Sequence, residues 1–168
     1  MLKLYKKTMT GLQYWEAWSV EQELILHWGK VGERGKSRTV PLNGEDQSTA
    51  IRREAKNPRK RGYRKIPTGR LVRIVIQYRI DGMGTTEDLD KRIQVQNLMD
   101  DRLGWLGLGH CDGGDIGSGT INVFCLVVDG SIAIPHVIDE LRSADLLHGA
   151  AITITSDAGD SIVWPKPM

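Results

Sequence analysis

Residues 28–35, WGKVGERG, place a tryptophan and a cation within a run of glycines. An indole such as Trp28, at the end of a strand and close to Lys30, can present a flat apolar face to a sugar or a base. The glycines allow close approach of the backbone, and their N–H groups can face phosphate. The same pattern is compatible with a core tryptophan that closes a sheet, the glycines then serving only a bulge and a tight turn.

Residues 52–70 form a strongly basic segment. They contain nine cations and a single acid, Glu54. Such a run is typical of a surface that follows a phosphate backbone, and Tyr63 adds an aromatic ring within it. A solvated helix face followed by an exposed connector is the alternative interpretation. Because phosphate contacts carry no sequence information, the segment does not predict base-specific recognition.

Residues 107–119 combine six glycines with four residues that could do chemistry, His110, Cys111, Asp112 and Asp115. Cys111 and His110 could act as nucleophile and base, but neighbouring residues of an extended chain point to opposite sides. His110 and Asp112 could share a face, yet two ligands are too few for a metal site. We therefore expect a bulged hairpin linking two strands, and no catalytic residue, metal or cofactor.

The elements that must position Trp28 are predicted to be four antiparallel strands and a helix. The strands fall at 2–10, 13–20, 23–32 and 36–42, where polar and apolar residues alternate or β-forming residues are frequent. Residues 44–57 predict a helix with acids at its front and bases at its back, which places Arg52 and Lys56 on one face. Pro58 should end this helix, because the residue before a proline avoids the α region.

Taken together, these features resemble the WGR domain over roughly residues 1–67. They are the WGKVGERG motif, the strands before and after it, a helix containing Ala50, and the closing element Arg61-Gly62-Tyr63. The family is named for Trp-Gly-Arg and usually continues as Val-Gly-x-x-Gly. Here Lys30 replaces the arginine, and the 50–63 segment is shorter than typical and is interrupted by Pro58. Lysine keeps the charge of arginine but lacks its planar guanidinium group. We therefore still expect Lys30 to attract phosphate, but not to make contacts that need guanidinium geometry.

The resemblance implies non-catalytic binding to nucleic acid, especially to DNA ends and breaks. WGR domains are best known in DNA-dependent poly(ADP-ribose) polymerases, in which the tryptophan packs on the sugar-phosphate at a break and the arginine contacts backbone. The catalytic motifs of those enzymes are not seen, and the chain looks more like bacterial proteins with a lone WGR domain beside other small modules. The expected nucleic-acid-binding residues are Trp28, Lys30, Arg34, Lys36, Arg52, Lys56, Lys60, Arg61 and Arg64.

The second half of the chain predicts the order strand, helix, two strands, helix, strand, which is the β-α-β-β-α-β plan of the ferredoxin-like fold. The first strand spans 71–80, and Thr85 or Thr86 caps a helix that has an acidic first turn and runs to Gly104. The second strand must come from 105–116, where glycine is dense. The remaining elements are a strand at 120–129, a helix near 134–141, a strand at 150–155 and a possible addition at 161–165.

The two halves of the 168-residue chain also differ in net charge. Residues 1–70 carry 16 basic and 7 acidic side chains, whereas 71–168 carry 7 and 14. We expect an α+β protein with two domains, a WGR-like domain at 1–68 that binds DNA or another nucleic acid and a ferredoxin-like domain at 69–168. Mutual neutralisation of the two halves is one alternative. Another is a regulatory or immunity-type module whose acidic half holds a partner protein.

The amino-acid composition limits the classes of protein to which the chain could belong. The chain is 40% hydrophobic and 26% charged, which is typical of globular proteins. Two cysteines are too few for a disulfide framework. No stretch has the roughly 18 apolar residues that cross a membrane, and the first ten residues lack the apolar block of a secretion signal. The expected location is the cytoplasm.

Overall fold

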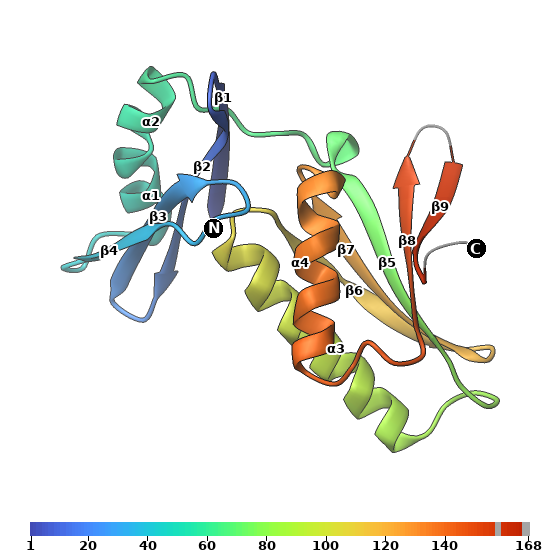
Figure 1. Cartoon of the computed structure of the whole chain (residues 1–168). Helices are drawn as coiled ribbons and strands as arrows, with labels where there is room; N and C mark the ends of the chain where they lie inside the picture. The colour runs from blue at the N-terminus through green and yellow to red at the C-terminus, as the bar shows by residue number, and fades with distance from the viewer. Residues whose placement is uncertain (157–158, 166–168) are drawn as a thin grey trace. The chain divides into compact units, whose positions relative to one another are not determined.

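The computed structural model describes residues 1–156 and 159–165. The chain divides into two compact units, residues 1–67 and 68–168. Each contains one antiparallel sheet and a pair of α-helices, so the α+β class expected from the sequence is confirmed. Figure 1 shows the helices and strands of both units.

The first unit is built on a four-stranded meander. Its strands are β1 (Leu2–Thr8), β2 (Gly11–Val20), β3 (Glu23–Lys30) and β4 (Lys36–Pro41). Each strand pairs antiparallel with the next, so the sheet order is β1-β2-β3-β4. Helices α1 (Gln47–Glu54) and α2 (Lys56–Lys60) lie on one side of this sheet (Figure 1).

Alternation along the strands gives the meander two faces of different chemistry. The face beneath the helices is apolar, because register places Leu4 opposite Trp15 and Ala17 opposite Leu26. These side chains pack with helix residues in one buried core, to which α1 contributes Ala50. The opposite face carries the polar residues of the alternation, including Glu16 and His27, and both are buried.

The helical segment differs from the expected single helix. Helix α1 ends at Glu54, and a second short helix starts at Lys56, so Arg52 and Lys56 lie on different helices. Pro58 does not end the helical segment but occupies the first turn of α2 and is buried. In a first turn the missing proline N–H would have had no intrahelical partner, so proline is tolerated there.

The second unit contains a five-stranded sheet. Its elements in chain order are η1 (Thr68–Arg70), β5 (Val72–Arg79), α3 (Thr86–Trp105), β6 (Gly109–Gly117), β7 (Thr120–Val127), α4 (Gly130–Ser143), β8 (Ala150–Ser156) and β9 (Gly159–Trp164). The sheet order is β6-β7-β5-β8-β9, with every neighbouring pair antiparallel. Both α-helices pack against one face of this sheet (Figure 1).

Local signals in the sequence place the helices of this unit. Thr85 caps α3 in a reciprocal capping box with Asp88, as an acidic first turn after a threonine predicts. Asp129 caps α4 through the backbone N–H groups of Ser131 and Ile132. The buried Tyr78 hydroxyl of β5 donates a 2.8 Å hydrogen bond to the Leu146 carbonyl, which ties the end of the α4 segment to the sheet.

The glycine-rich segment is the bulged hairpin that the sequence predicts. Residues 109–117 form the edge strand β6, which pairs with β7 through a register shift between Cys111 and Gly114. Gly109 lies so close to the β7 backbone that a Cβ there would overlap the Leu126 carbonyl. Glycine is therefore required at this position for pairing, which explains why a glycine-dense segment can form a strand. None of the helices in the described residues is long and apolar enough to cross a membrane.

Candidate nucleic-acid interface

Trp28 lies on the helix-covered face of the first sheet but is not sealed inside it. In register it stands opposite Trp15 of β2 and Lys36 of β4, and its side chain is 36% exposed. The ring borders a groove of about 290 Å³ between the sheet and the helices, which we call the Trp28 groove. The other lining residues are Trp15, Leu26, Arg38, Glu54, Asn57, Pro58, Arg61 and Tyr63.

The loop that follows Trp28 is held close to it by glycine. Gly32 adopts a φ of 88°, in the left-handed region that glycine favours. A Cβ at Gly35 would overlap both the Trp28 carbonyl and the Tyr14 hydroxyl. The close approach of this loop to β2 and β3 therefore requires glycine at position 35. The WGKVGERG motif thus encodes a tight return of the chain against the strand that carries the indole.

A buried polar network lies behind the motif, on the other face of the sheet. The Tyr14 hydroxyl is 2.9 Å from His27 Nε2, and His27 Nδ1 is 2.7 Å from Glu16 Oε1. Lys3 Nζ lies 2.9 Å from Glu16 Oε2. Because a carboxylate only accepts, His27 donates from Nδ1 to Glu16, and its Nε2 forms a second hydrogen bond with the Tyr14 hydroxyl.

The same network reaches the glycine loop. The backbone N–H of Gly35 donates to the Tyr14 hydroxyl, and His27 directly precedes Trp28 in β3. The chain is therefore fixed just before the indole and again at the end of the loop. Burial, helped by the Glu16 carboxylate, raises the pKa of Tyr14 to about 12. The cross-strand pairing of His27 with Glu16 is the feature that identifies the network.

The raised pKa of Tyr14 predicts a loss of stability at alkaline pH. An unfolded chain releases the tyrosine proton near pH 10, whereas the folded chain keeps it up to about pH 12. The unfolded state then binds fewer protons, so the free energy of unfolding decreases as the pH rises through this window. Tyr14→Phe should be less stable at neutral pH yet show a shallower alkaline decline, measured by urea unfolding at several pH values.

A control separates this effect from general alkaline unfolding. Burial also raises the pKa of Tyr78, in the second unit, to about 12. Tyr78→Phe should therefore leave the alkaline decline of the first unit unchanged in the same series of urea unfolding measurements. An equal decline in Tyr14→Phe and the unmodified protein would contradict the assignment to Tyr14.

The expected binding cations fall into two groups, and the first group is already engaged. Lys30 Nζ is 2.7 Å from Glu33 Oε1, and Arg52 donates to the carbonyl and hydroxyl of Ser48. Arg64 donates to two backbone carbonyls in its own turn. Arg34 is exposed in the loop after β3. Lys30 is therefore paired with a carboxylate, whereas Arg52 and Arg64 donate to neutral oxygens and keep their positive charge.

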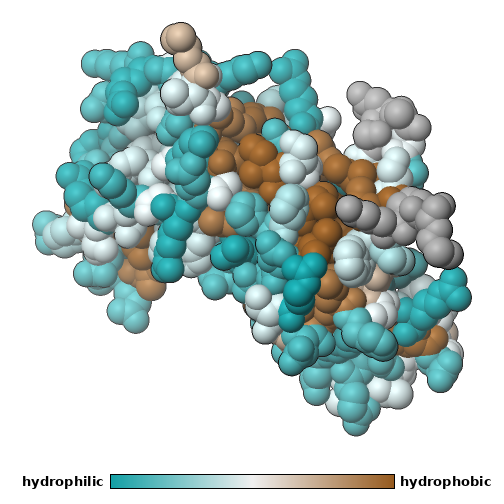
Figure 2. Space-filling model, in the orientation of Figure 1, coloured by the Kyte–Doolittle hydropathy of each residue, from teal (hydrophilic) through white to brown (hydrophobic). Residues whose placement is uncertain are grey.

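The second group comprises four exposed cations that have no carboxylate within ion-pair distance in the part of the chain that the structure describes. They are Lys36, Lys56, Lys60 and Arg61. Arg61 lines the Trp28 groove, and Lys36 stands opposite Trp28 on the same face of the sheet. Lys56 lines neither this groove nor the hollow described next. Figure 2 shows hydrophilic side chains gathered over α2.

A second hollow, of about 400 Å³, adjoins the Trp28 groove through Tyr63, which lines both. We call it the basic hollow. Its other lining residues are Leu4, Arg59, Lys60, Arg64 and Lys65, so four of the six carry positive charge. Of the expected residues, Trp28 and Arg61 therefore line the Trp28 groove and Lys60 and Arg64 line the basic hollow. Neither hollow is lined by the other five, which are Lys30, Arg34, Lys36, Arg52 and Lys56.

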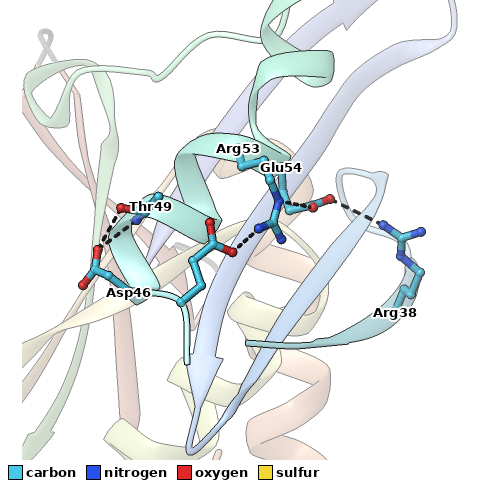
Figure 3. Close-up of polar contacts among 6 residues, drawn as sticks. Arg38, Asp46, Thr49, Arg53 and Glu54 are labelled. Atoms are coloured by element: carbon cyan, nitrogen blue, oxygen red, sulfur yellow. Dashed lines mark hydrogen bonds and ion pairs between the residues drawn. The ribbon is translucent and has the colours of Figure 1, made fainter. Parts of the chain in front are cut away.

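Three polar residues of the groove were not among the expected set: Arg38, Glu54 and Asn57. Arg38 Nη2 is 3.5 Å from Glu54 Oε2, and Arg53 contacts Glu54 and Glu45, so the single acid of the basic segment is held between two arginines (Figure 3). The two-residue spacing of Lys36 and Arg38 in β4 is the sequence signal that places both on the groove side. The loop bearing Glu45 leads to Asp46, which caps α1 through Thr49 (Figure 3).

Comparison with protein-family models, with curated proteins and with solved structures finds no significant match to this chain. The function must therefore be argued from the residues themselves. Among the described residues, no three His, Cys, Asp or Glu side chains are grouped so as to hold a metal ion.

Proposed function

We propose that the first unit binds nucleic acid, with DNA ends as the preferred target, and that it does so without catalysing a reaction. The observation that carries this proposal is the position of Trp28 in a groove that shares Tyr63 with a basic hollow. An aromatic face beside clustered cations is the combination that single-stranded and terminal nucleotides bind, through stacking and phosphate attraction.

The preference for ends follows from how far the indole is exposed. Trp28 is 36% exposed and lines the groove. Bases inside a continuous duplex are stacked on both faces and offer no flat surface to an indole that lines a groove. At a strand end or a break, a terminal base or sugar has a free face that can enter the groove. Trp28 therefore supplies selectivity for ends in this proposal.

The phosphates would be bound by the exposed cations of the same surface. Lys36 and Arg61 flank the indole, and Lys60 lies in the basic hollow. None of the three has a carboxylate partner in the described residues, so no internal ion pair opposes phosphate binding. Sequence-independent binding of this kind is expected to be roughly micromolar or weaker at physiological salt.

The architecture supports the proposal at the level of fold. We assign the first unit to a WGR-like arrangement because it has a four-stranded meander, a tryptophan-glycine loop and helices that follow the sheet. We assign the second unit to a ferredoxin-like arrangement, because β5-α3-β6-β7-α4-β8 has that element order and β9 extends the sheet. Function is argued from the site of the first unit, since a fold alone does not define one.

The dependence of binding on salt tests the electrostatic part of the proposal. We expect the affinity for a fluorescent blunt-ended duplex to fall steeply from about 50 to about 200 mM salt, because bound cations release counterions. Lys60→Gln should weaken binding and flatten the slope of log affinity against log salt by about 1. Fluorescence anisotropy at several salt concentrations measures both quantities.

Lys7→Gln provides the matched control. It removes the same charge from an exposed lysine of β1 that lines neither the Trp28 groove nor the basic hollow. This variant should retain the slope of the unmodified protein. A flat salt profile, or equal effects of the two substitutions, would remove the argument for a localised phosphate-binding surface.

A further inference from the structure

Two thiols face each other across the hairpin of the second unit. Cys111 of β6 and Cys125 of β7 are directly paired in the antiparallel register, so their side chains lie on the same face of the sheet. Their sulfur atoms are 3.0 Å apart. Both cysteines are free; Cys111 is partly exposed and Cys125 is buried.

The backbone hydrogen bonds between β6 and β7 show whether Cys111 and Cys125 form a hydrogen-bonded or a non-hydrogen-bonded pair. The N–H of Val128 donates to the Leu108 carbonyl, so the positions of Leu108 and Val128 form a hydrogen-bonded pair. Such pairs alternate along an antiparallel ladder, which makes Cys111 and Cys125 a non-hydrogen-bonded pair. In agreement, the Cys111 N–H donates away from β7, to Asp100 Oδ1 at 2.9 Å.

That position suits a covalent link between the sulfurs. Non-hydrogen-bonded pairs have Cα atoms about 4.5 Å apart, which falls at the short end of the range spanned by disulfides. The sulfurs need to approach by about 1 Å to reach bonding distance. The register shift between Cys111 and Gly114 adjoins the pair, and Cys111 lies on the edge strand, where adjustment requires only one neighbouring strand to follow.

We propose that Cys111 and Cys125 form a redox modification site that takes a small-molecule disulfide as its oxidant and becomes an intramolecular disulfide. The partly exposed Cys111 sulfur attacks one sulfur of the small disulfide, forming a mixed disulfide and releasing one small thiol that takes the proton. The Cys125 sulfur then attacks Cys111 Sγ, forming the internal bond and releasing the second small thiol with the remaining proton. The two cysteines are oxidised by two electrons, and the small disulfide is reduced to two thiols.

The surroundings of the two sulfurs set the order of these steps. Cys125 is 0% exposed, so an external disulfide reaches Cys111 first. The hydrogen bond with Cys111 and burial raise the pKa of Cys125, which keeps its thiol protonated in the reduced protein. Conversion of Cys111 into a mixed disulfide removes the thiol hydrogen bond that contributes most to this shift, so Cys125 can act as the resolving group. This inference is independent of nucleic-acid binding by the first unit.

The experiment treats the reduced full-length chain with excess oxidised glutathione and follows the intact mass after acid quenching. The expected product is a monomer that has lost two hydrogen atoms, with a peptide pair linked through Cys111 and Cys125 in a digest. It should form at least about tenfold faster in the native chain than in denaturant, because folding fixes the sulfurs in contact.

Two variants distinguish the roles of the sulfurs, with circular dichroism to check folding. Cys125→Ala should accumulate a stable glutathione adduct at Cys111, whereas Cys111→Ala should leave Cys125 unmodified under native conditions. A wild-type chain that keeps both thiols, stops at a stable adduct or forms only disulfide-linked dimers would overturn the proposal. The wild-type result decides the question even if a variant fails to fold.

Discussion

Replacing Trp28 by alanine should weaken binding to a blunt DNA end by about tenfold or more, and binding to covalently closed duplex by much less. A base stacked on an aromatic side chain contributes about 1–3 kcal/mol, which corresponds to roughly 5- to 150-fold in affinity. Closed duplex offers no free base face, so its binding depends on the cations of the surface, which the substitution leaves in place. The measurement is competition of blunt, nicked and closed circular DNA against a fluorescent blunt-ended duplex.

Two further variants make the test specific to the ring. Trp28→Phe keeps a flat aromatic face in the groove and should recover much of the preference for ends. Met9→Ala removes a fully exposed apolar side chain of the same unit that lines neither hollow, and should behave as the unmodified protein. Equal losses of affinity on ends and on closed duplex in Trp28→Ala would leave stacking at this residue without support.

Replacing Glu16 by alanine should destabilise the first unit by about 3 kcal/mol or more. The carboxylate is 2% exposed and lies within ion-pair distance of both Lys3 and His27. Removal of one partner from a buried charged network leaves the others without compensation, and such losses commonly cost about 3–5 kcal/mol. Native-state hydrogen exchange of the β2 and β3 amides measures this effect in the first unit alone.

Glu23→Ala is the matched control for that experiment. Glu23 is an exposed carboxylate at the start of β3, in the same sheet, and surface substitutions of this kind usually change stability by less than about 0.5 kcal/mol. Glu16→Ala should also weaken DNA binding, because the network fixes His27 next to the indole and the glycine loop behind it. Unchanged amide protection in Glu16→Ala would show that the network does not stabilise the sheet.

Sequence alone predicted the order of the strands and the two helices of the second unit, but it missed the break between α1 and α2. Alternating residues predicted β1, β2 and β5, because strand side chains point to opposite faces with a period of two, and runs of β-forming residues predicted β3, β4 and β7. The sequence placed the cap of α3 at Thr85 or Thr86, because its hydrogen bonds are made within one turn, and the structure has it at Thr85. Strand β6 was expected within 105–116 because the β-α-β-β-α-β plan requires a second strand there.

The surface around Trp28 was decided by tertiary structure. Whether the indole was core or exposed depended on how α1 and α2 cover the sheet, and the break between these helices separated Arg52 from Lys56. Which cations remained available depended on ion pairs between distant segments, such as Arg38 with Glu54. Contacts between residues far apart in the chain depend on packing, and local propensity carries no information about them. The sequence therefore identified the aromatic and basic residues that could bind a ligand. Only the fold showed which of them are exposed and have no ion-pair partner.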